Sequence, residues 1–194
     1  MDSAAVPEVL CAALVLTGRP VLVVGGGRVA EQKLVRLLAC RARITVIAPE
    51  ATAAIHAWHT DGELTWCERT FGPADVAGFV FVLTATGHAA IDGEVFAACE
   101  ARAVLCNAAD RPDQCSVWLL AQRRRGRIVI GAGTMGSAPG LAGRLADLAA
   151  STLTPTVERA VQAYARLRRA HGAAAARASR TMSWERMARG DPPP

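Results

Sequence analysis

The feature that most constrains the fold is an apolar run near the start of the chain that ends in three glycines. Residues 21–24 (VLVV) are four consecutive aliphatic residues, a pattern typical of a strand buried on both faces. After the glycines at 25–27, apolar residues recur from Ala30 to Leu38 at the spacing of one helix face. The sequence therefore predicts a strand, a tight glycine turn and a helix.

Small residues hold three fixed places in this turn. Gly25, Gly27 and Ala30 match G-x-G-x-x-G/A, in which one residue makes the turn, one lets the backbone approach a pyrophosphate, and one packs helix against strand. The first turn of the helix would point free N–H groups at the phosphates. We predict a dinucleotide site here; the alternative is a glycine-rich turn that binds nothing.

Length and composition limit the class of protein. A chain of 194 residues suits one domain with an appendage, and 52% hydrophobic residues can fill a core. No apolar run approaches the ~20 residues that span a bilayer. The first residues, MDSAA, lack the basic start of a signal peptide. We therefore expect a cytoplasmic protein that does not bind membranes.

The six cysteines include no C-x-x-C pair, and four of them lie in or beside apolar segments. This pattern favours buried free thiols over disulfides or a zinc site. We therefore predict no metal centre.

The formal net charge of +5 comes largely from the last third of the chain, through Arg123, Arg124, Arg125, Arg127 and the arginines after Arg159. Nucleic acid is the first partner that such a balance suggests, but no recognition helix, zinc finger or aromatic platform accompanies it. We therefore expect no nucleic acid as partner. The arginines either bind a polyanionic small molecule or lie solvated on turns and helix faces.

Strands and helices alternate along the first half of the chain. An apolar lead-in at 6–16, a short strand or a loop, precedes the first core strand. Such alternation predicts an α/β fold, a Rossmann-like doubly wound parallel sheet. Further strands are expected at 44–47, 64–67, 79–83 and 104–106, and helices at 51–59 and 89–102.

In such a sheet, ligands bind beyond the carboxyl ends of the strands. The segment after the second strand carries an acid, Glu50, which favours NAD over NADP because it would repel a 2′-phosphate. After the fourth strand, Thr84, Ala85 and Thr86 are small enough to let a nicotinamide ribose approach. His88 follows them, either as a group that transfers protons or as the cap of the next helix.

The segment after the fifth strand carries Asp110. Its position puts a carboxylate at the mouth of the crevice. The alternative is that it only turns the chain, as aspartates in loops commonly do.

An ordered set of motifs resembles the dehydrogenase and ferrochelatase module of siroheme synthase. The resemblance covers about residues 19–148. It is carried by VVGGGRVA (23–30), ITVIAPE (44–50), AT (85–86), CNAAD (106–110), CS (115–116) and TMGSAP (134–139). It implies a stand-alone NAD-dependent precorrin-2 dehydrogenase that makes sirohydrochlorin, an activity that some members follow with insertion of Fe²⁺ to give siroheme.

The resemblance also assigns site residues. The nucleotide contacts of the family fall on Arg28 and Val29 in the glycine turn and on Pro49 and Glu50 after the second strand. Its catalytic aspartate falls on Asp110. Because the reference pKa of an aspartate is ~3.9, burial against the substrate would have to raise it for Asp110 to act as a base. Arg123–Arg125 and Arg144 are expected to hold the carboxylates of the tetrapyrrole.

The domain organisation follows from the same resemblance. We expect an NAD-binding Rossmann domain at 1–113, a small α+β dimerisation region at 114–152, and a C-terminal helical region and tail at 153–194, in a homodimer. Within these regions we expect strands at 117–121 and 128–130 around a turn at 122–126, a helix from Leu141, a basic amphipathic helix at 156–169 and a frayed tail at 173–194.

Three positions near the expected tetrapyrrole pocket depart from the family pattern. Ala138 stands where a serine is usual, Gly87 and His88 replace an acidic pair, and Gly143 stands where an arginine is common. Two other functions therefore stay open: a related NAD-dependent oxidoreductase with a changed substrate, and an NAD-binding sensor without catalysis.

Overall fold

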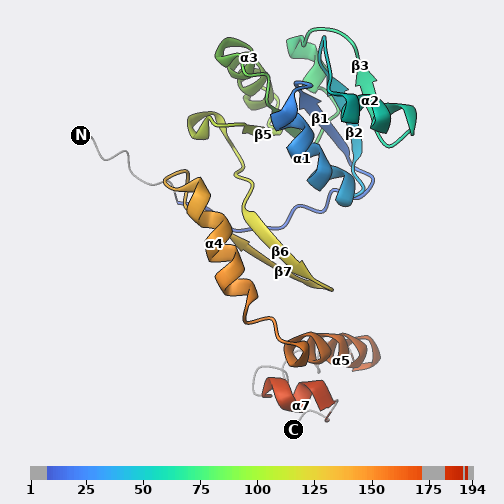
Figure 1. Cartoon of the computed structure of the whole chain (residues 1–194), viewed down its shortest axis with the longest axis vertical. Coiled ribbons are helices and arrows are strands. Elements are labelled where there is room, and N and C mark those ends of the chain that lie inside the picture. Colours follow the sequence, from blue (N-terminus) through green and yellow to red (C-terminus); the bar gives the residue numbers. More distant parts are fainter. Residues whose placement is uncertain (1–7, 172–181, 190, 192–194) are drawn as a thin grey trace, which may run out of the picture. The chain divides into compact units, whose positions relative to one another are not determined.

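The computed structural model describes residues 8–171, 182–189 and 191 (Figure 1). The chain divides into two units, Met1–Leu119 and Leu120–Pro194. Residues 114–119 lie in the first unit, where the N–H groups of Ser116 and Val117 donate to the Cys106 carbonyl. The two units are described separately.

The first unit is built on a five-stranded sheet in which every pairing is parallel. The strand order β3-β2-β1-β4-β5 places β1 at the centre, where the winding changes direction. The prediction of a Rossmann-like doubly wound sheet is confirmed. The strands are β1 (Pro20–Val24), β2 (Arg43–Ile47), β3 (Thr65–Cys67), β4 (Phe81–Thr84) and β5 (Leu105–Ala108).

Alternate residues of β1 face two different apolar cores. Val21 and Val23 pack with residues of α1 (Arg28–Ala39) and α2 (Ala53–Thr60). Leu22 and Val24 pack on the other side with α3 (Ala89–Glu100) and η1 (Pro73–Val76). Both faces of the strand are therefore buried, which is why its sequence is apolar without interruption.

The segment before β1 is a loop over residues 8–16, and Leu16 at its end is buried in the first core. The expected lead-in is thus a loop rather than a strand; residues 6 and 7 lie outside the described part. All six cysteines are free, but the prediction that they are buried holds only for Cys99 and Cys106: Cys40, Cys67 and Cys115 are half-buried, and Cys11 is exposed. A hydrogen bond with Cys99, together with burial, raises the pKa of Cys106.

The second unit begins with an antiparallel hairpin of β6 (Ala121–Arg125) and β7 (Ile128–Ala132). The expected turn at 122–126 is wrong, because all but its last residue belong to β6. The chain turns at Gly126 and Arg127, and Gly126 has the positive φ of +56° that glycine accepts readily.

Ion pairs explain how arginines occupy this strand. The Arg123 guanidinium donates to both Asp147 oxygens, at 2.6 and 2.9 Å, from β6 to α4 (Pro139–Ala150). Arg125 donates to Glu158 at 3.0 Å and to the Leu153 carbonyl. These two arginines therefore stabilise the second unit itself.

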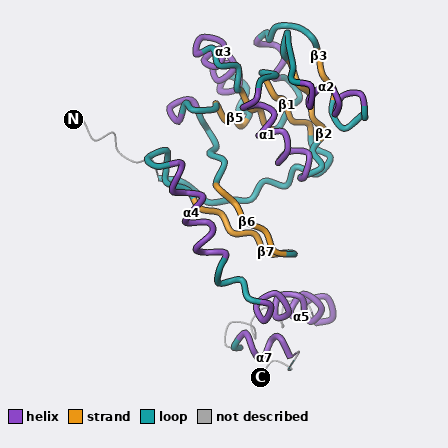
Figure 2. Tube along the Cα trace, in the orientation of Figure 1, coloured by secondary structure: helices purple, strands orange, loops and turns teal. Residues whose placement is uncertain are grey.

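The described end of the chain is helical. Figure 2 shows α5 (Pro155–His171) and α7 (Trp184–Arg189) as helices, and residues of the two are in contact. Met187 is buried, and the N–H of Arg186 donates to the Ser183 hydroxyl at 3.3 Å, as at a helix N-cap. The expected frayed tail is therefore wrong for 184–189; residues 173–181, 190 and 192–194 lie outside the described part.

Candidate functional site

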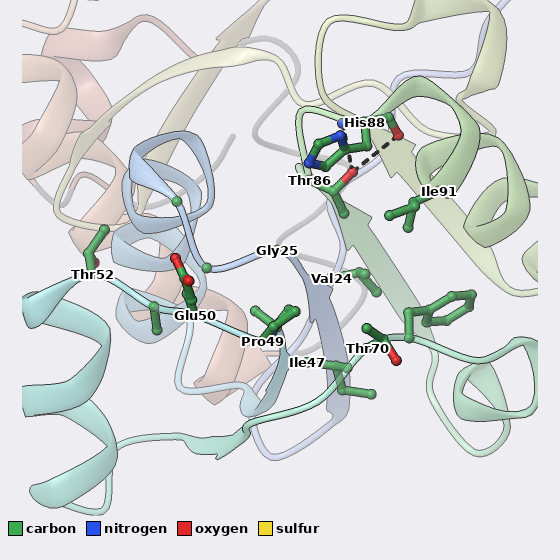
Figure 3. Close-up of a pocket in the computed structure, with 15 residues that line it drawn as sticks. Val24, Gly25, Ile47, Pro49, Glu50, Thr52, Thr70, Thr86, His88 and Ile91 are labelled. Carbon is green, nitrogen blue, oxygen red and sulfur yellow. Dashed lines mark hydrogen bonds between the residues drawn. The ribbon is translucent and has the colours of Figure 1, made fainter.

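A cavity of about 580 Å³ opens at the carboxyl ends of β1 and β2 and beside the segment after β4 (Figure 3). The glycine turn, the segments after β2, β3 and β4, and the first turn of α3 contribute its walls. Its lining comprises Val24, Gly25, Gly26, Gly27, Ile47, Ala48, Pro49, Glu50, Ala51, Thr52, Thr70, Phe71, Thr86, His88 and Ile91. This is the edge of the sheet where a doubly wound fold binds ligands.

The first two glycines of the turn are packed against backbone. A Cβ on Gly25, whose φ is +116°, would lie 2.4 Å from the Ala85 carbonyl oxygen. A Cβ on Gly26 would lie 2.1 Å from the Glu50 carbonyl oxygen. No side chain fits at either position, so these glycines hold the turn tightly between the ends of β2 and β4.

The third glycine is different. A Cβ on Gly27 would meet nothing within 4 Å, although the residue lines the cavity. Gly27 is the N-cap of α1 and makes no side-chain cap, so the first N–H groups of the helix are available to a ligand. Ala30 is fully buried where α1 packs on the sheet. The turn therefore has the form of an anion cradle with open space above Gly27.

Only some of the nucleotide contacts predicted in this turn line the cavity. Gly25 and Gly27 line the cavity. Arg28 and Val29 begin α1, and both are exposed outside the lining residues. The assignment of these two residues to the nucleotide stays a prediction.

The segment after β2 brings Pro49 and Glu50 to the cavity, and both are exposed. Its backbone is held in place on two sides. The Trp66 indole N–H donates to the Ala48 carbonyl at 3.0 Å, and the Thr52 N–H donates to the Gly26 carbonyl at 2.9 Å. The Glu50 carboxylate thus stands on a fixed loop next to the glycine turn.

The segment after β3 supplies Thr70 and Phe71, which sequence reasoning missed. Arg69 donates to both oxygens of Asp75, at 2.7 and 2.8 Å, and to the Thr70 carbonyl at 3.0 Å. Asp75 also accepts the Gly72 N–H at 2.8 Å. The Arg69 hydrogen bonds lower the pKa of Asp75. The Arg69–Asp75 ion pair fixes this wall of the cavity, but no sequence motif predicts the pair.

The segment after β4 places its three predicted residues differently. Thr84 and Ala85 are buried and lie outside the cavity lining, whereas Thr86 lines it. The Thr86 hydroxyl accepts the N–H of His88 at 3.0 Å (Figure 3). His88 is the N-cap residue of α3, but its side chain makes no capping hydrogen bond. It lines the cavity instead.

Asp110 follows β5 in a turn, with a positive φ of +59° and an exposed side chain. It is not among the cavity-lining residues. The loop that carries it is anchored to the sheet edge, because the Asn107 amide donates to the Val117 carbonyl at 3.0 Å and the Ser116 hydroxyl accepts the Cys106 N–H at 2.8 Å. A catalytic role for Asp110 therefore requires the substrate to cover it.

Among the residues that the structure describes, no three His, Cys, Asp or Glu side chains gather as metal ligands would. No helix in the described ranges is both long and apolar enough to cross a membrane.

Comparisons with known proteins agree with this geometry. Residues 12–121 match the family described as "Putative NAD(P)-binding". Siroheme synthase 1 of Aeromonas hydrophila is 31% identical over 172 residues, 89% of this chain and 37% of the relative. Siroheme synthase 1 of Yersinia enterocolitica is 35% identical over 127 residues, 66% of this chain and 27% of the relative. The chain thus spans well under half the length of these curated relatives.

A solved structure is similar over most of its length. SirC, a precorrin-2 dehydrogenase, superposes with a TM-score of 0.68 and is 29% identical, covering 82% of this chain and 79% of its own. The likeness therefore includes residues beyond the first unit.

Proposed function

The chain belongs to the NAD(P)-binding family that includes the N-terminal module of siroheme synthase, and we propose that it is an NAD-dependent precorrin-2 dehydrogenase. The resemblance seen in its motifs is thus confirmed at the level of the family. The proposed reaction converts precorrin-2 to sirohydrochlorin. The likeness to SirC, which carries this activity in its name, supports the choice of substrate.

The observation that carries the proposal is the open space above Gly27. Gly25 and Gly26 are glycines because backbone packs against them, but Gly27 has no neighbour within 4 Å that would exclude a side chain. A glycine at an open N-cap that lines the cavity is explained if a ligand occupies that space. The free N–H groups of α1 make a phosphate the natural occupant.

Dehydrogenation removes a hydride from one carbon of the substrate and a proton from a neighbouring carbon or nitrogen. NAD, when bound, accepts the hydride. The protein then has to hold substrate and cofactor in contact and to accept the proton. We assign the proton to the Asp110 carboxylate, which follows β5 and which the macrocycle has to cover for the transfer.

Insertion of Fe²⁺ into sirohydrochlorin is the second activity to measure, with the metal as a substrate. The tetrapyrrole offers four nitrogens of its own, so the protein would need only to accept protons. We expect this step to be slow beside the dehydrogenation.

We also propose that the chain acts as a homodimer in the cytoplasm, where NAD is available. Leu141, Leu145 and Leu148 recur along one face of α4 and are 51%, 48% and 70% exposed. A second copy that covered this stripe would bury apolar area that a monomer leaves in water. Sedimentation analysis of the wild type and of Leu145→Glu tests the assembly.

The test of the function is anaerobic incubation of the chain with precorrin-2 and NAD. The expected result is the absorbance of reduced cofactor and the spectrum of sirohydrochlorin, both dependent on enzyme. NAD binding without turnover would favour the two alternatives, a changed substrate or a sensor. Failure to bind NAD at all would overturn the proposal.

A further inference from the structure

A buried carboxylate that does not line the cavity holds one of its walls. Asp92, in the first turn of α3, is 5% exposed, and its neighbour Thr84 at the end of β4 is fully buried. Burying a carboxylate costs free energy unless hydrogen bonds compensate for the lost water.

One oxygen of Asp92 takes three hydrogen bonds. Oδ1 accepts the Thr84 hydroxyl, the Thr86 N–H at 3.2 Å and the Thr86 hydroxyl at 2.9 Å. The Thr86 hydroxyl in turn accepts the His88 N–H at 3.0 Å. All three bonds to Asp92 thus end on Oδ1 and none of them on Oδ2. The whole segment from Thr84 to His88 is therefore tied to a single atom.

Packing alone does not explain the residue. The other buried residues of α3 are Val95, Ala98 and Cys99, which are apolar and belong to the core beneath the sheet. A carboxylate near the positive end of the helix is favourable there, but an exposed acid would serve the helix equally well. What burial adds is the fixed geometry of the turn after β4.

The turn after β4 forms one wall of the cavity. Ala85 lies between Thr84 and Thr86, and its carbonyl packs against the place where Gly25 has no Cβ. Thr86 and His88 line the cavity itself. A shift of this turn would therefore disturb the packing of the Ala85 carbonyl against Gly25 and would displace the cavity wall.

We infer that Asp92 is a positioning residue for the dinucleotide, acting through Thr84 and Thr86 rather than by contact. The inference rests on the proposed function, since it presupposes that NAD fills the cavity. It predicts that NAD affinity depends on the oxygen acceptor at position 92 and not on the negative charge.

Asp92→Ala and Asp92→Asn separate these properties. Alanine removes the acceptor, so the dissociation constant for NAD, measured by titration calorimetry, is expected to rise about tenfold. Asparagine keeps an oxygen that can take the same three bonds. Its dissociation constant is expected to stay within about twofold of the wild type.

Thr84→Val and Thr84→Ser form a matched pair away from the ligand. Valine has the shape of threonine but cannot donate to Asp92, whereas serine can. Thr84 lies outside the cavity lining, so a weaker NAD affinity in Thr84→Val, restored in Thr84→Ser, arises through the turn. A merely structural role would lower Tm without this split, because valine suits a fully buried strand position.

The outcomes are distinct. If the wild type does not bind NAD, the proposed function fails. If the wild type binds NAD and both Asp92→Ala and Thr84→Val bind it equally well, the inference is wrong. If Asp92→Ala does not fold, the Thr84 pair and Asp92→Asn decide: loss in Thr84→Val with retention in the other two supports the inference, and unchanged affinity in Thr84→Val refutes it.

Discussion

The Ala85 carbonyl oxygen fills the space beside Gly25, 2.4 Å from where a Cβ on that glycine would lie. Two residues along the same turn, Gly27 has nothing within 4 Å of its own Cβ position. One turn thus contains a glycine required by the fold and a glycine whose open side faces the cavity. Substitutions at the two positions should therefore fail in different ways.

Gly27→Val is expected to abolish NAD binding in a folded protein. The backbone at Gly27 has φ −82° and ψ −176°, which valine adopts readily, and the branched side chain would fill the space assigned to the pyrophosphate. We expect affinity to fall by about 100-fold or more. The poorer N-cap lowers stability by about 1 kcal/mol. Calorimetric titration with NAD and a thermal melt measure the two effects.

Gly25→Ala is the control for Gly27→Val, because it tests the glycine that the fold requires. A Cβ there meets the Ala85 backbone at a positive φ, so stability is expected to fall by about 3 kcal/mol. If Gly27→Val bound NAD as the wild type does, the dinucleotide would not lie in this turn.

Glu50 is expected to make the protein prefer NAD to NADP. Its carboxylate stands on the fixed loop after β2 and would repel a 2′-phosphate. Titration of both cofactors should show a preference of about tenfold or more, and Glu50→Arg should narrow it. Glu63→Arg makes the same charge change at an exposed residue outside the cavity lining, so it should leave the preference unchanged and is the matched control. A wild-type preference for NADP would contradict this role of Glu50.

The ion pair that holds the wall after β3 predicts a pH dependence. Hydrogen bonds from Arg69 lower the pKa of Asp75 in the folded state. The stability it contributes is therefore complete above the unfolded pKa of ~3.9 and is lost as the pH falls through the lower, folded value. Asp75→Asn should reduce Tm at pH 7 by about 2–4 °C.

The measurement is Tm of both proteins between pH 7 and pH 3. The difference between them is expected to shrink below pH ~4, as protonated Asp75 comes to resemble asparagine. A difference that stayed constant over this range would mean that the charge on Asp75 contributes nothing.

Local pattern was enough to predict the first unit. An aliphatic run buried on both faces, followed by glycines and a helical period, is compatible with few folds. Strands and helices then alternate along the rest of the unit, as a doubly wound sheet requires. The hairpin of the second unit was missed in part because a run of three arginines (123–125) is more typical of a solvated surface segment than of a strand. The acidic partners of Arg123 and Arg125, Asp147 and Glu158, lie 24 and 33 residues away in the sequence.

The candidate site divides in the same way. Gly25, Glu50 and Thr86 lie within three residues of the ends of β1, β2 and β4, so sheet topology alone predicted that they meet at one edge. Sheet topology could not predict the roles of Phe71 and Asp92. Phe71 depends on where a long loop folds back, and an acid in the first turn of a helix usually signals a solvated face. Only the packing of α3 shows that Asp92 points inward.

Asp110→Asn is expected to cut turnover of precorrin-2 by about 10²- to 10⁴-fold, because an amide cannot accept the proton as a base. The residue has a φ of +59°, a region that asparagine tolerates as well as aspartate does, so the turn is preserved. NAD affinity and Tm should stay close to those of the wild type. Single-turnover kinetics with NAD in excess isolate the chemical step.

Asp113→Asn is the matched control, since Asp113 is an exposed acid in the same loop, 3.5 Å from Arg111. It should keep nearly full turnover if the effect at Asp110 is specific. Turnover within a few-fold of the wild type in Asp110→Asn would reduce Asp110 to a turn residue. His88 would then be the next base to test, because it already lines the cavity and a neutral imidazole has a ring nitrogen that can accept a proton.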